Sequence, residues 1–127
     1  MARVVTLQDA RGCVVCDSCA VADRPIGRLR GLLGRAGLAP GEGLLLRPAP
    51  SIHTWFMRFP IDAVFLDADL CVLDVRVAVR PWRVAARRGA RAVLELSAGE
   101  AVRHGLRPGD RLSSVPPRTL AAVEERS

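Results

Sequence analysis

The sequence contains no Lys, no Tyr and no Asn, so all nineteen of its basic residues are Arg. Such a restricted alphabet is typical of GC-rich codon usage acting on surface positions. The net charge of +6 at pH 7 and the pI of about 10.8 would otherwise indicate a nucleic acid or an anionic membrane as the partner. Because codon usage explains much of this charge, composition alone does not identify an anionic partner.

Long hydrophobic runs are also absent, since no apolar segment approaches the roughly 18 residues that span a membrane. The N-terminal segment lacks the basic stretch and apolar core of a secretory signal. We therefore expect a cytoplasmic protein with no membrane partner. Apolar residues make up 50% of the 127 positions, which is enough for one hydrophobic core. The expected organisation is a single β-rich domain at 1–115 and a loosely held tail at 116–127.

Short alternating apolar stretches, separated by Gly and Pro, predict strands along most of the chain. We expect strands at 4–7, from 13 onward, and at 44–46, 52–57, 63–67, 70–79, 91–97 and 111–115. A helix is expected near 26–35 and a helical turn at 98–104. Alternation in the longest strand predicts one core face made of Cys71, Leu73, Val75, Val77 and Val79. The expected fold class is mainly β, a single-domain antiparallel β-sandwich or distorted barrel with one or two short helices.

Three of the four Cys lie close together, at Cys13, Cys16 and Cys19, whereas Cys71 is distant. This spacing leaves three interpretations open: a zinc or iron–sulfur site, a reversible disulfide, and ordinary packing. In a regular strand, Cys13 and Cys19 point to one side and Cys16 to the other, so the three thiolates do not converge on one ion. Cys71 lies on an apolar strand face, where a free thiol packs as a small hydrophobic group. We therefore favour packing and expect no bound metal or cofactor.

The segment 51–67 is the richest in chemically distinctive residues, because it holds all three Phe, one of the two Trp and one of the two His. Its pattern predicts a strand, a bend at Pro60 and a second strand. In the first strand, Ile52 and alternate residues after it face the core. His53 and Trp55 then face the opposite surface, where a His beside an indole can act as a base, a metal ligand or a stacking element.

Five sequence motifs follow one another along most of the chain. They are R-G-L-L-G-R at 30–35, G-L-L-L at 43–46, H-T-W-F-M-R-F-P-I-D-A-V-F-L-D at 53–67, V-L-E-L-S-A-G at 93–99 and H-G-L-R-P-G-D at 104–110. This order resembles the bacterial and archaeal family called domain of unknown function 192, over about 27–112. The unit H-T-x-x-M-R-F-P-I-D, which lacks the longer Met-Lys-Asn-Thr stretch of many members, resembles a shorter subgroup. The resemblance implies a compact, mainly β sandwich with short helices, and it implies no known activity.

Five residues are candidates for a ligand-binding site: His53, Trp55, Arg58, Asp62 and Glu95. Arg58 and Asp62 flank the bend, where they form an ion pair that holds it, or else Arg58 binds a carboxylate or a phosphate. Glu95 lies in a strand suited to burial, so its carboxylate needs a partner. Arg58 and His53 are the candidates for that partner.

These residues favour a binding module over an enzyme, because the sequence has no nucleophile elbow, phosphate-binding Gly loop or metal motif. The leading hypothesis is a small β-domain that binds a small molecule or a protein through a cleft near 51–67. The alternative is a hydrolytic enzyme or a metal-binding protein that uses His53, Asp62 and Glu95. A third hypothesis is nucleic-acid binding through the Arg-rich stretch 76–91. It is disfavoured because solvated loops and strand edges carry similar charge.

Overall fold

The computed structural model describes residues 3–22, 37–54 and 57–116, and their secondary structure is mainly β. In chain order the elements are β1 (Arg3–Gln8), β2 (Val14–Ala22), β3 (Glu42–Leu46), β4 (Ser51–His53), β5 (Ile61–Leu66), β6 (Val72–Val79), β7 (Val84–Ala86), β8 (Ala92–Ser97), α2 (Glu100–Arg103) and β9 (Ser113–Val115). The helix expected near 26–35 and the tail beyond 116 lie outside the described residues. Among the described elements, no helix is long and apolar enough to cross a membrane.

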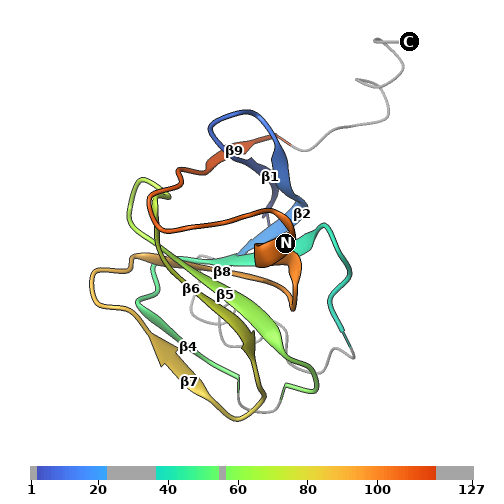
Figure 1. Cartoon of the computed structure of the whole chain (residues 1–127), viewed down its shortest axis with the longest axis vertical. Coiled ribbons are helices and arrows are strands. Elements are labelled where there is room, and N and C mark those ends of the chain that lie inside the picture. The colour runs from blue at the N-terminus through green and yellow to red at the C-terminus, as the bar shows by residue number, and fades with distance from the viewer. Residues whose placement is uncertain (1–2, 23–36, 55–56, 117–127) are drawn as a thin grey trace.

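Seven strands form one sheet in the order β6-β5-β8-β3-β2-β1-β9, and β4 pairs with β7 in a small second sheet (Figure 1). The fold class expected from the sequence is therefore confirmed. The large sheet ends at β6 on one side and at β9 on the other, so it is open, as in a sandwich. Its one departure from the expected antiparallel pattern is the pairing of β2 with β3, which is parallel.

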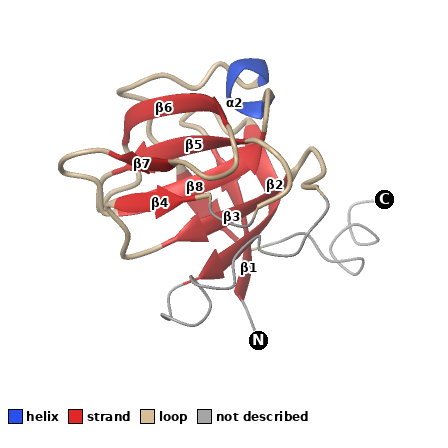
Figure 2. Ribbon diagram, turned by 90° about the horizontal axis from the view of Figure 1, so that it is seen from below, coloured by secondary structure: helices blue, strands red, loops and turns tan. Residues whose placement is uncertain are grey.

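Both faces of the large sheet are covered, which explains why β5 is buried along its whole length. On one face, the cluster that contains Val64 also includes Ala101 of α2. On the other face, Phe65 packs in a cluster with Ile52 of β4 and Ala85 of β7. Figure 2 shows α2 and the small sheet beside the large sheet. We call the side of the large sheet that packs against α2 the α2 face. The side that packs against the two-stranded ribbon of β4 and β7 is the ribbon face.

An irregularity between β1 and β2 changes the direction in which the cysteines point. Val5 is opposite Cys19 and Leu7 is opposite Cys16. Three residues along β2 therefore correspond to two residues along β1. Such a β-bulge shifts the alternation of the side chains beyond it by one residue. Cys16 and Cys19 are consequently both buried on the α2 face, whereas Cys13 is exposed. The expectation that Cys16 points away from Cys19 is wrong for this reason.

The core face expected for β6 is also wrong, because two register shifts interrupt the pairing of β6 with β5. Leu73 and Val79 pack on the ribbon face, and Val75 packs on the α2 face. Val77 is 55% exposed, and the next residue, Ala78, has a φ of 49°. This left-handed conformation is uncommon for a residue with a side chain. A regular alternation in the sequence therefore corresponds to an irregular edge strand.

Candidate functional site

The first strand of the aromatic motif is shorter than expected, because the chain leaves the ladder at Thr54. β4 ends at His53, and Thr54 has no exposed surface although it is polar. The Thr54 hydroxyl donates to the carbonyl of Arg80 at 2.6 Å and accepts the N–H of Arg83 at 2.9 Å. The Thr54 carbonyl accepts the N–H of Trp82 at 3.0 Å. Thr54 thereby fixes the turn that precedes β7.

The outer side of β4 and β7 is exposed and partly apolar. His53 is opposite Val84 in the pairing of these strands, and both side chains are exposed, whereas Ile52 and Ala85 pack on the ribbon face. The placement of His53 opposite to Ile52, expected from the sequence, is confirmed. Val84 is 64% exposed, and Trp82, with a φ of 64°, is 57% exposed. We call His53, Trp82 and Val84 the ribbon surface.

Arginine residues flank the ribbon surface along the chain at both ends of β7. They are Arg80, Arg83, Arg87 and Arg88, and all four are exposed. The carboxylate of Asp74 is already bound to Arg76, whose Nε lies 2.8 Å from its Oδ2. This hydrogen bond is the main cause that lowers the pKa of Asp74, and the charge of Arg87 adds to it. The ribbon surface is therefore apolar at its centre, and its flanks are basic.

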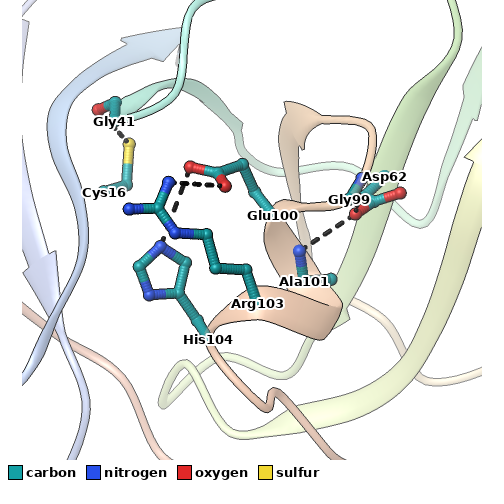
Figure 3. A network of polar contacts seen from close by, with 8 residues as sticks. All are labelled: Cys16, Gly41, Asp62, Gly99, Glu100, Ala101, Arg103 and His104. Carbon is teal, nitrogen blue, oxygen red and sulfur yellow. Dashed lines mark hydrogen bonds and ion pairs between the residues drawn. The ribbon is translucent and has the colours of Figure 1, made fainter.

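Asp62 is fully buried, and both oxygens of its carboxylate accept backbone N–H groups. Oδ1 accepts the N–H of Ala78 at 2.8 Å. Oδ2 accepts the N–H groups of Gly99 at 3.0 Å and Ala101 at 2.9 Å (Figure 3). These three bonds connect β5 to the irregular part of β6 and to the first turn of α2. Asp62 has these partners in place of the ion pair with Arg58 that the sequence suggested.

Glu95 lies on the opposite face of the sheet from Asp62. In the ladder between β5 and β8, Ala63 is opposite Glu95 and Asp62 is opposite Leu96, and adjacent positions of a strand point to opposite faces. Glu95 is 4% exposed, and burial raises the pKa of its carboxyl to about 8. No hydrogen bond or charge of a described residue contributes to this shift. Glu95 is therefore mostly a neutral acid at pH 7.

The structure thus divides the five candidate residues. His53 and Arg58 are exposed, Asp62 and Glu95 are buried on opposite faces of the large sheet, and Trp55 lies outside the described residues. The trio of His53, Asp62 and Glu95 is not brought together, because the sheet separates the two acids. Within the described part of the chain, no group of three or more His, Cys, Asp and Glu side chains is placed to hold a metal ion.

Sequence reasoning did not single out Trp82 or Val84. Trp82 lies inside the Arg-rich stretch 76–91, and Val84 belongs to a strand of three residues between the strands expected at 70–79 and 91–97. The available signal is the single Trp between arginine residues, because a large apolar side chain there has to be buried or to make a contact.

A cavity of about 580 Å³ opens between the turn that joins β1 to β2 and the segment after α2. Its charged lining residues are Asp9, Arg11, Arg107, Asp110 and Arg111, and His104 also lines it. Both acids accept backbone N–H groups of nearby residues. Asp9 accepts those of Arg11 and Cys13, and Asp110 accepts that of Arg107. The cavity contains none of the five candidate residues, so it is separate from the site expected from the sequence.

A family model matches residues 6–114, which include all the strands and the helix described above except the first residues of β1 and the last of β9. The chain belongs to the DUF192 family. The description of DUF192 is "Uncharacterized ACR", so membership names no reaction. The resemblance carried by the five sequence motifs is confirmed by this match.

Relatives of this DUF192 chain occur in archaea and bacteria. The UPF0127 protein PYRAB11210 of Pyrococcus abyssi (strain GE5 / Orsay) is 35% identical over 82 residues, which are 59% of this chain and 67% of the relative. A "putative transcription regulator" of Sinorhizobium meliloti 1021 has a crystal structure with a TM-score of 0.77 and 28% identity, covering 90% of this chain and 94% of that one. A protein of unknown function from Novosphingobium aromaticivorans DSM 12444 has a TM-score of 0.75 and 25% identity, covering 88% and 84%.

Proposed function

We propose that this DUF192 protein is a cytoplasmic, non-catalytic binding module whose ribbon surface recognises an acidic segment of a partner protein. The observation that carries the proposal is the exposure of two large apolar side chains in one short segment, one of which, Val84, is opposite His53. Trp82 is 57% exposed and Val84 is 64% exposed. Exposed apolar side chains flanked by charged residues are typical of protein-interaction sites. The ribbon surface includes His53 of the 51–67 segment, where sequence reasoning expected a binding site.

The ribbon surface is held in its shape by buried hydrogen bonds, which supports a binding role. The Thr54 carbonyl accepts the N–H of Trp82, and the Thr54 hydroxyl donates to the carbonyl of Arg80 and accepts the N–H of Arg83. A side chain on a turn that is already ordered loses little conformational entropy when a partner binds. Trp and Arg are also the residues most often found at the energetic centres of interfaces.

The charge at the flanks of the ribbon surface favours an acidic partner. Four exposed Arg residues flank β7, and the whole chain carries a net charge of +6. Opposite charges across an interface accelerate association and discriminate against partners of the same charge. An acidic segment with one or two apolar side chains therefore matches both parts of this surface.

A protein partner explains the ribbon surface better than a nucleic acid does. Proteins bind single strands largely by stacking successive bases on aromatic side chains. Of the aromatic residues that the structure describes, only Trp82 is exposed. Val84 offers no aromatic face for a base, but its branched side chain packs well against an apolar side chain of a protein.

The test uses a synthetic peptide in which Glu residues surround Leu and Phe, and a control peptide with Gln in place of Glu. In an NMR titration, we expect the acidic peptide to shift the resonances of His53, Trp82 and Val84. The control peptide should bind at least about tenfold more weakly. Val84→Arg should remove binding. Val102→Arg, at a position of α2 that is 72% exposed, is the matched control and should leave the affinity unchanged.

Equal affinity for the two peptides, or equal loss of affinity in Val84→Arg and Val102→Arg, contradicts this proposal. A thymidine oligonucleotide is titrated in parallel with the peptides. If the oligonucleotide binds the same residues more tightly, with an affinity that falls steeply with salt, the ribbon surface is a nucleic-acid interface instead.

A further inference from the structure

The bulge in β2 creates a pair of buried thiols that the proposed binding role does not use. Cys16 and Cys19 have no exposed surface, and both side chains lie in the core cluster on the α2 face. Their partners on β1, Leu7 and Val5, are two residues apart. In an extended strand this spacing corresponds to about 6.6 to 6.8 Å between Cα atoms, and disulfides span Cα separations of up to about 6.8 Å. The two cysteines therefore share one face of the sheet at a Cα separation near the upper limit that a disulfide spans.

The two thiols differ in acidity. The neighbouring thiol of Cys19 is the main cause that lowers the pKa of Cys16, although burial opposes it. The neighbouring thiol of Cys16, followed by burial, raises the pKa of Cys19, and the charge of Arg47 opposes this weakly. Because the thiolate is the nucleophile, Cys16 is the one that reacts first.

Charged groups of two elements face Cys16. Asp17 on β2 and Glu100 on α2 both act to raise its pKa. Glu100 is buried, and its carboxylate binds Arg103 at 3.3 Å and His104 at 3.8 Å. Figure 3 shows this cluster of α2 beside the strand that carries Cys16. Part of the field of Glu100 at the thiol is therefore neutralised by the charge of Arg103.

We propose that Cys16 and Cys19 are a redox-sensitive dithiol, which a small hydroperoxide converts into an intramolecular disulfide. The thiolate of Cys16 attacks the terminal oxygen of the peroxide, the O–O bond breaks, and the second oxygen leaves as an alcohol or as water after it takes up a proton. Cys16 is then a sulfenic acid. The sulfur of Cys19 attacks the sulfur of Cys16, the S–O bond breaks, and the proton of Cys19 leaves with the hydroxide as water. The dithiol loses two electrons, and the peroxide gains them.

Burial does not prevent this reaction, because Cys16 lies at a margin of the sheet. β2 pairs with β3 only from Ser18 onward. The turn at Gly41 covers the thiol of Cys16. The Gly41 carbonyl accepts the S–H of Cys16 at 3.4 Å and the N–H of Ser18 at 3.0 Å. Opening this turn breaks the two hydrogen bonds to the Gly41 carbonyl, and local openings cost much less than global unfolding. Hydrogen peroxide is only slightly larger than water, so a small opening admits it.

The test uses a chain with Cys13→Ser and Cys71→Ser, so that only Cys16 and Cys19 react. Hydrogen peroxide is added to the folded protein, and the intact mass and the free thiols are measured. We expect a mass loss of two hydrogen atoms, the loss of both thiols, a monomeric product and full reversal by dithiothreitol. When Cys19→Ser is added, oxidation should stop at the sulfenic acid of Cys16, which a cyclic 1,3-diketone traps.

Two results overturn the proposal. One is that both thiols stay reduced in the folded protein under conditions that oxidise the exposed Cys13 of the unaltered chain. The other is that the disulfide forms only in a concentration of urea that unfolds the protein, because the fold then does not create the pair. If a Ser variant does not fold, disulfide mapping of the unaltered chain decides the question. A bond between Cys16 and Cys19 supports the proposal, and any other pairing refutes it.

Discussion

At the level of single residues, Asp62 and Glu95 are two buried acids in different circumstances. Asp62 accepts three backbone N–H groups, whereas Glu95 is desolvated without a hydrogen bond from a described residue. Hydrogen bonds to a carboxylate favour its charged form, and burial without them favours the neutral acid. The same kind of side chain therefore holds the backbone together at one position and forms a pH-sensitive group at the other.

We expect Asp62→Asn to destabilise the protein by about 2 to 4 kcal/mol, because an amide nitrogen cannot accept the N–H groups that one of the carboxylate oxygens now accepts. Urea unfolding measures this change. Asp69→Asn, at an exposed position of the turn before β6, is the matched control and should change the free energy of unfolding by less than about 0.5 kcal/mol. Similar values for the two variants would show that the bonds of Asp62 contribute little.

Glu95 should make the stability of the protein depend on pH. Its pKa is about 8 in the folded protein and 4.5 for an ordinary Glu. Between these values the folded state binds a proton that the unfolded state has lost. The contribution of Glu95 to stability is therefore complete below pH 4.5 and is lost as the pH rises through 8.

The expected difference in the free energy of unfolding between about pH 5 and pH 8 is on the order of 3 kcal/mol, with the lower stability at pH 8. The Glu95→Gln side chain is neutral at both pH values. The free energy of unfolding of this variant should therefore change much less between these pH values. Urea unfolding of both proteins at several pH values measures the effect. Parallel pH profiles for the two proteins would mean that Glu95 is ionised in the fold.

At the level of elements, the small sheet is reinforced by the hydrogen bonds of Thr54. β4 and β7 have three residues each, and so short a pair is marginal by itself. The hydroxyl of Thr54 adds bonds to Arg80 and Arg83 from inside the turn. The order of the ribbon surface therefore comes from a buried polar group beneath it.

We expect Thr54→Val to speed the amide exchange of Arg83, because its N–H loses the hydroxyl that accepts it at 2.9 Å. The free energy of unfolding should fall by about 1 to 3 kcal/mol. Hydrogen exchange followed by NMR and urea unfolding measure the two effects. Thr54→Ser keeps the hydroxyl and is the control. If the amide of Arg83 exchanges equally fast in both variants, Thr54 does not organise this turn.

The bulge in β2 also explains a glycine in the neighbouring strand. A Cβ at Gly43 would lie 2.7 Å from the sulfur of Cys16 and 3.1 Å from the backbone oxygen of Glu95. No larger residue fits there while Cys16 points to this face. The glycine of the motif G-L-L-L is therefore required by a side chain that the bulge has turned inward.

At the level of the whole molecule, the class of fold and most elements could be predicted from local patterns. Apolar runs bounded by Gly and Pro indicate β3 and β8, and the motif order identifies the family. These features depend on neighbouring residues, which the sequence shows directly. His53 was placed correctly for the same reason, because the faces of a short strand follow from alternation alone.

The site could not be assembled from the sequence, because its geometry depends on the register between strands. Asp62 and Glu95 lie on opposite faces because Ala63, and not Asp62, is the partner of Glu95. A shift of one residue would have brought the two acids to the same face. The bulge that pairs Cys16 with Cys19 is likewise one extra residue, and it leaves no mark in the composition of β2.

The pairing of β1 with both β2 and β9 has a consequence for synthesis of the chain on the ribosome. Thr6, Leu7 and Gln8 are opposite residues of Ser113–Val115, more than a hundred positions later in the chain. Until that segment has left the ribosome, one side of β1 has unpaired N–H and C=O groups that can template aggregation. We thus expect nascent chains that stop before Ser113 to be prone to aggregate along this side of β1.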